Sequence, residues 1–131
     1  MNMLEGQNDL LIYKDKDGNI VVDAIYRDET LWLTQKGMAK VFDVDRTVIT
    51  KHLKNIFTDG ELNKNSVCAK FAHTAEDGKT YKTDFYNLDA IIAVGYRVNS
   101  KKATEFRIWA TKVLKEYIIK GFALNDERFI R

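Results

Sequence analysis

The sequence predicts an α+β fold in which β-hairpins and short helices form a single compact domain over residues 1–131. Runs rich in Ile, Val, Phe and Tyr flank Asp-Gly pairs at residues 17–18 and 77–78, the pattern of β-hairpins. Residues 33–57 and 88–121 instead repeat apolar residues at intervals of three and four, the period of an amphipathic helix. A chain of 131 residues with 45% hydrophobic and 31% charged residues can bury the core of such a domain.

The first hairpin is expected over residues 10–26. The runs LLIYK and NIVVDAIY provide its strands, and the segment around Asp17-Gly18 provides its turn. The segment Leu31-Trp32-Leu33 follows as a short third strand. We expect Trp32 to lie in the core or against the hairpin rather than to stack on a nucleic-acid base.

Residues 33–57 predict a helix-turn-helix. Its first helix should run from Gln35 to Phe42 with Thr34 as N-cap, and its second from Arg46 to Phe57 with Asp45 as N-cap. Thr and Asp suit these positions because a side-chain oxygen can accept a hydrogen bond from a free N–H of the first turn.

Apolar residues in this segment are spaced so that the two helices pack against each other. They are Met38, Ala39 and Phe42 in the first helix, Val44 in the turn, and Ile49, Leu53 and Ile56 in the second helix. Helices that cross at about 90–120° need a small residue at their contact, which Ala39 provides. The turn residue Asp43 is expected in a left-handed backbone conformation, where glycine is usual and Asp is tolerated.

The outer face of the second helix carries side chains that suit duplex DNA. They are Arg46, Thr47, Thr50, Lys51 and Lys54. Arg can hold a guanine with two hydrogen bonds, Thr can contact a thymine methyl, and Lys can reach phosphates. The alternative is a pair of helices whose charges are only solvated.

A second hairpin is expected over residues 69–86, after an irregular segment at residues 61–68. A hairpin that follows a helix-turn-helix suggests a wing, as in winged-helix proteins, with Lys79 and Lys82 as phosphate contacts. Glu76 and Asp77 weaken this interpretation, and a purely structural hairpin is the alternative.

Two helices are expected at residues 88–98 and 100–121. The first is almost wholly apolar, begins after the N-cap Asn87 and contains Gly95, which indicates close packing. The second has an apolar stripe and should end at Gly121. Residues 122–131 look like the start of a further element and stop without a natural terminator. We therefore expect the chain to be the N-terminal part of a longer protein.

Composition excludes several classes of protein. No apolar run approaches 18 residues, so no membrane span is expected, and the N-terminus lacks the pattern of a secretory signal. One cysteine, Cys68, excludes an internal disulfide and fits the cytoplasm. With two histidines and one cysteine we expect no metal site, and no cofactor is predicted.

Enzymatic activity is not expected. Cys68 would need His52 or His73 within hydrogen-bond reach to act as a nucleophile, and nothing in the spacing indicates this. Asp43, Asp45 and Asp59 would have to converge on folding to form a nuclease metal site.

Residues 31–62 (LWLTQKGMAKVFDVDRTVITKHLKNIFTDGEL) and residues 80–127 resemble the RhuM family of bacterial virulence-associated proteins. The segment Ser100–Lys120, which contains Phe106 and Trp109 after a basic start, is similar to the end of the Bro-N domain of phage and viral proteins. The resemblance implies a DNA-binding module, often encoded in mobile elements, and supplies no catalytic residues.

The function predicted from the sequence is therefore sequence-specific binding of double-stranded DNA by a winged-helix-like helix-turn-helix, with a regulatory role as an expectation. A homodimer is one arrangement that would double the contact. The alternative, from a different class, is a protein-interaction or oligomerisation module.

Overall fold

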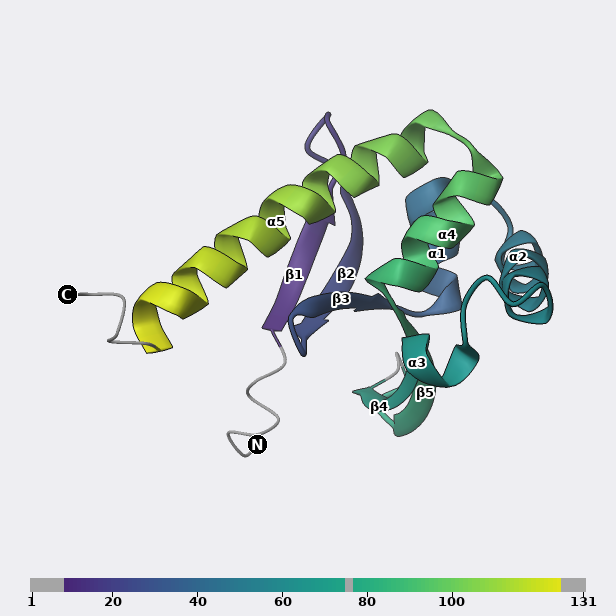
Figure 1. Cartoon of the computed structure of the whole chain (residues 1–131), viewed down its shortest axis with the longest axis horizontal. Coiled ribbons are helices and arrows are strands. Elements are labelled where there is room, and N and C mark those ends of the chain that lie inside the picture. The colour runs from purple at the N-terminus through teal and green to yellow at the C-terminus, as the bar shows by residue number, and fades with distance from the viewer. Residues whose placement is uncertain (1–8, 75–76, 126–131) are drawn as a thin grey trace.

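The structure is a computed structural model that describes residues 9–74 and 77–125. Its elements, in chain order, are β1 (Asp9–Lys14), β2 (Ile20–Arg27), β3 (Thr30–Leu33), α1 (Gln35–Phe42), α2 (Arg46–Thr58), α3 (Lys64–Val67), β4 (Cys68–Thr74), β5 (Thr80–Asn87), α4 (Leu88–Val98) and α5 (Lys101–Asn125). The predicted α+β class is confirmed, with an N-terminal hairpin, a helical pair, a second hairpin and two further helices (Figure 1).

The strands form an antiparallel sheet in the order β1-β2-β3-β5-β4. The short strand β3 joins the two hairpins, because Trp32 pairs with Ile25 of β2 on one side and with Asn87 of β5 on the other. The second hairpin is thus fixed beside the helical pair through a contact between segments more than fifty residues apart.

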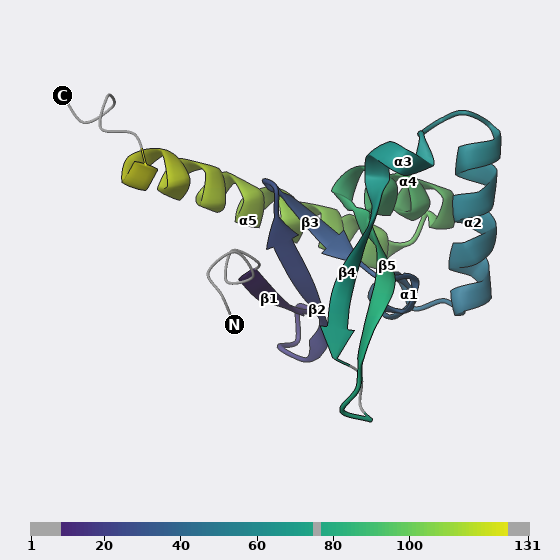
Figure 2. The ribbon, with the colours of Figure 1, turned by 90° about the horizontal axis from the view of Figure 1, so that it is seen from below.

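One face of the sheet is covered by helices. Tyr13, Leu31 and Leu33 point to this face and are at most 4% exposed. They join a core with Phe42 of α1 and Phe106 of α5. Figures 1 and 2 show α5 running alongside the sheet, with its C-terminal end projecting past β1.

The helical pair forms at the predicted residues, except that α2 ends at Thr58 rather than at Phe57. α1 begins at Gln35 and ends at Phe42, and the Thr34 hydroxyl accepts a hydrogen bond of 2.9 Å from the Gly37 N–H. Asp43 ends α1 in the left-handed conformation, with φ of 58°. Ile49, Leu53 and Ile56 of α2 are buried. The buried stripe fixes the orientation of α2 and therefore which of its residues face solvent.

The two N-caps of this pair differ, and this gives a test. Thr34→Ala should lower the free energy of unfolding by about 1 kcal/mol because it leaves a helical N–H without its partner. Asp45→Ala should change it much less, since the Asp45 side chain makes no capping hydrogen bond. Urea denaturation of the two variants measures the difference, and equal losses would contradict this view of the caps.

The helix α4 packs closely against its neighbours. It begins after Asn87, whose side chain accepts a hydrogen bond from the Ala90 N–H. A Cβ added at Gly95 would lie 3.3 Å from the Phe42 ring and 3.4 Å from the Ala103 Cβ. The close packing predicted at Gly95 is confirmed.

Two other predicted boundaries were wrong. Residues 61–68 are not irregular throughout, since Asn63 Oδ1 accepts a hydrogen bond from the Asn65 N–H and begins the short helix α3. α5 does not end at Gly121 but continues to Asn125. A glycine inside a helix costs only about 1 kcal/mol relative to alanine, so it does not by itself end a helix.

The other sheet face carries a small aromatic cluster. Trp32, which is 7% exposed, contacts the Phe71 ring edge-on at 5.1 Å. The Trp32 indole donates to the Arg27 carbonyl, and the Arg27 guanidinium lies over Phe71. Trp32 is buried, as predicted, but it packs mainly against the second hairpin rather than the first.

Candidate nucleic-acid interface

The predicted contact face of α2 lies on the surface. All of its members are exposed, namely Arg46, Thr47, Thr50, Lys51 and Lys54. This follows from helical geometry, because residues on the opposite side of α2 are buried against α1 and α4. The five side chains therefore occupy one accessible strip of a helix of 13 residues.

A hydrogen-bond chain links this face to the sheet. Thr50 Oγ1 lies 2.5 Å from Gln35 Oε1 and 3.1 Å from the Arg46 carbonyl oxygen, and either can accept its proton. The Gln35 amide donates to the Tyr86 hydroxyl on β5 at 3.1 Å. The Thr50 hydroxyl is thus engaged within the protein.

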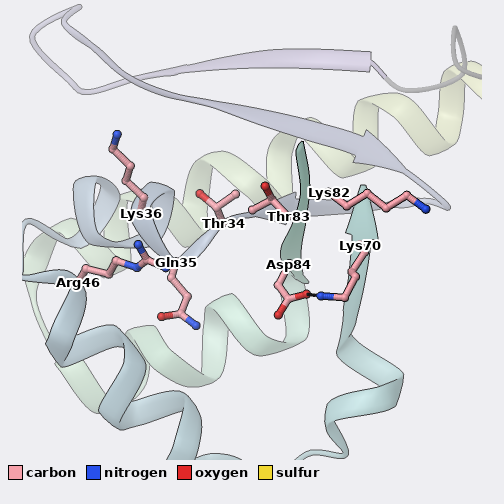
Figure 3. Close-up of a pocket in the computed structure, with 8 residues that line it drawn as sticks. All are labelled: Thr34, Gln35, Lys36, Arg46, Lys70, Lys82, Thr83 and Asp84. Carbon is pink, nitrogen blue, oxygen red and sulfur yellow. Dashed lines mark hydrogen bonds and ion pairs between the residues drawn. The ribbon is translucent and has the colours of Figure 1, made fainter. Parts of the chain in front are cut away.

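A groove of about 420 Å³ lies between this helix and the second hairpin (Figure 3). It is lined by Thr34, Gln35, Lys36, Arg46, Lys70, Lys82, Thr83 and Asp84. In Figure 3, Gln35 and Arg46 lie on one side and Lys70 and Asp84 on the other, while Lys36 and Lys82 extend from the margins. The groove therefore lies between the start of α2 and the paired strands β4 and β5.

The groove carries more positive than negative charge. Its lining includes four basic side chains and one carboxylate. That carboxylate, Asp84, pairs across the β4–β5 ladder with Lys70, with Nζ and Oδ1 2.6 Å apart. The hydrogen bond from Lys70 to Asp84 raises the pKa of the Lys70 ammonium. The other three cations make no ion pair among the described residues.

A family model described as the virulence protein RhuM family matches residues 66–131, just over half of the chain. The chain belongs to the RhuM family. No curated protein and no solved structure matches it. The matched region runs from the end of α3 through β4, β5, α4 and α5, so it includes the wall of the groove that carries Lys70, Lys82 and Asp84. The resemblance of residues 31–62 to RhuM proteins and the Bro-N similarity stay predictions.

Two of the basic residues that line the groove of this RhuM-family chain were not predicted as site residues. Lys36 lies in α1, and the sequence pattern counted it only toward net charge. Lys70 alternates with apolar residues along β4. This pattern indicates that its side chain is exposed, but it does not show which element lies beside it. Its approach to α2 depends on the pairing of β3 with β5, which the residues around Lys70 do not encode.

The two predicted wing residues lie in different surroundings. Lys82 lines the groove. Lys79 is exposed in the turn, where its N–H donates to Asp77 Oδ1 at 2.8 Å. The Tyr81 hydroxyl donates to the other oxygen of Asp77, and these bonds lower the pKa of that carboxyl. The turn thus keeps a negative charge beside Lys79. Glu76 lies outside the described residues.

His52 lies half-buried on the side of α2 near α4. Burial, together with the charges of Lys51 and Arg97, lowers its pKa from the usual 6.5. Arg97 is fixed there by Asp59 and Glu61 at 3.3 and 3.0 Å. The folded protein therefore resists protonation of His52.

This shift predicts a pH dependence of stability. Below about pH 6.5 the unfolded chain binds a proton at His52 before the folded protein does, so stability present above that pH falls until the lowered native pKa is reached. His52→Gln should remove this part of the decrease. The free energy of unfolding, measured for both proteins at several pH values between about 5 and 8, gives the difference. The two proteins share every other titratable group, so parallel curves would contradict the prediction.

The residues considered for catalysis do not form a recognisable site in the described part of the chain. Burial raises the pKa of the half-buried Cys68 thiol, which opposes formation of a thiolate nucleophile. The His73 side chain lies outside the described residues. Among residues 9–74 and 77–125, no group of three or more His, Cys, Asp or Glu could hold a metal ion. No helix in the same ranges is long and apolar enough to cross a membrane.

Proposed function

We propose that this RhuM-family chain binds double-stranded DNA, with α2 as the helix that contacts the bases. The observation that carries the proposal is the exposed strip of Arg, Thr and Lys along α2, opposite a stripe that fixes the helix in place. An α-helix with its side chains is about 10–12 Å across, so α2 fits the major groove, which is about 12 Å wide.

The second hairpin supports a winged-helix arrangement. β4 and β5 follow the helical pair after the short helix α3 and join the sheet through β3. The Lys70 and Lys82 side chains of these strands line the same groove as Arg46, the first residue of α2. A duplex bound along α2 would therefore meet positive charge from the hairpin as well.

Within this proposal, sequence preference comes from the middle of α2. Thr47 and Lys51 lie on its exposed face, and the methyl group of Thr50 can contact a thymine. Lys54, further along the helix, suits a phosphate. Such preference would fit a regulatory protein.

Two measurements test the proposal. The affinity for duplex DNA should fall linearly with salt on logarithmic axes, because each neutralised phosphate releases counterions. Selection of bound duplexes from a random pool should enrich a short common sequence, and an inverted repeat of that sequence would indicate a dimer. Absence of binding at low salt, or an affinity that salt does not change, would contradict the proposal and favour a protein-interaction module.

A further inference from the structure

We infer that the groove between α1, α2 and the β4–β5 hairpin binds one phosphate of the DNA backbone, and that this phosphate replaces Asp84 as the partner of Lys70. The inference rests on the proposed DNA binding and adds a phosphate subsite in which the Asp84 carboxylate competes with the phosphate for Lys70.

The groove offers donors from three separate elements. Lys36 comes from α1, Arg46 from α2, and Lys70 and Lys82 from the hairpin. Arg and Lys are the main ligands of phosphate groups in protein–DNA complexes, and Arg can grip two phosphate oxygens at once. Four cations around one open hollow are the electrostatic environment that a phosphodiester favours.

One wall of the groove is preorganised. The Thr34 hydroxyl is held by the cap of α1, and Gln35 is fixed between Thr50 and Tyr86. In Figure 3 the Arg46 side chain extends toward Gln35, along this wall. A wall that is ordered before binding reduces the entropic cost of capturing a ligand.

This position changes the role expected for Arg46. The sequence suggests that Arg46 holds a guanine, but at the start of α2 it lines the groove together with three lysines. A phosphate contact there would make Arg46→Ala weaken all DNA sequences alike. Base contacts would then fall to Thr47 and Lys51, further along the exposed face.

Asp84 is the competitor. Its pair with Lys70 is solvent-exposed, with 65% of the Lys70 side chain and 36% of the Asp84 side chain accessible. Exposed ion pairs of this kind contribute little to stability, so a phosphate can replace the carboxylate at little cost. Because the two residues are directly paired across the ladder, the carboxylate stays in the groove and reduces its attraction for DNA.

The decisive variant is Asp84→Asn, which removes the competing charge. Its affinity for duplex DNA should rise about fivefold at 0.1 M salt, and the salt slope should steepen by about one. Asp23→Asn is the matched control, because Asp23 is also exposed on a strand but does not line the groove. Lys36→Ala and Lys82→Ala should each weaken binding to every sequence and reduce the slope by about one, whereas Lys112→Ala on α5 should not.

The outcomes separate this inference from the proposed function. If the wild-type chain binds duplex DNA but Asp84→Asn, Lys36→Ala and Lys82→Ala behave as their controls, the inference alone is overturned. If the wild-type chain binds no duplex DNA, both fail. The other source of phosphate is free inorganic phosphate. A titration with inorganic phosphate alone, monitored through the amide chemical shifts of Thr34 and Lys70, tests whether the groove binds it. Tight binding of free phosphate without any effect of these variants on DNA would also overturn the inference.

Discussion

Phe106→Ala is expected to lower the free energy of unfolding by about 3–5 kcal/mol, the usual cost of deleting a buried phenyl ring. Phe106 is 1% exposed and contacts β1 and α1 as well as a neighbour in its own helix, α5. The centroid of its ring lies 5.2 Å from the ring centroid of Tyr13 in β1, 6.3 Å from that of Phe42 in α1, and 5.6 Å from that of Trp109. Removing it leaves a cavity where the sheet, the helical pair and α5 meet.

Urea denaturation measures this loss, and the same helix offers the control. Ile108 is 65% exposed, so Ile108→Ala should change stability by less than about 0.5 kcal/mol. Similar effects of the two substitutions would show that α5 does not pack on the sheet through Phe106.

Loss of Lys51 and Lys54 together is expected to weaken DNA binding about 30-fold at 0.15 M salt and to reduce the salt slope by about two. Both side chains are exposed on α2, three residues apart. If each contacts one phosphate, the double variant releases about two fewer counterions from the DNA when the complex forms. Fluorescence anisotropy with a labelled duplex, measured over a range of salt concentrations, yields both quantities.

The matched control is Lys112→Ala with Lys115→Ala. These lysines are also exposed and three residues apart on a helix, but they belong to α5. The control changes net charge equally and should leave binding nearly unchanged. Equal weakening by the two double variants would mean that net charge alone attracts DNA, with no defined contact at α2.

Much of the helical pair could be predicted from the sequence because its signals are local. Thr34 begins α1 through a bond to a residue three positions later, and Asp43 ends it with a left-handed conformation that few residues tolerate. The buried stripe of α2 follows helical spacing and defines the exposed face as its complement.

The groove could not be predicted because it depends on contacts between distant segments. Gln35 and Tyr86 are 51 residues apart, and Lys70 faces Asp84 only in one strand register. The end of α5 was missed for a different reason, since a single glycine at position 121 is a weak stop signal beside helix-forming neighbours.

The central claim is that the exposed face of α2 contacts duplex DNA. Amide chemical shifts of the labelled chain, followed during titration with a duplex from the random-pool selection, test it most directly. We predict that the largest changes fall on residues 46–54 and on Lys82, with little change on the exposed sheet residues Leu10 and Ile12. Changes confined to that sheet face or to α5, with α2 unaffected, would contradict the claim.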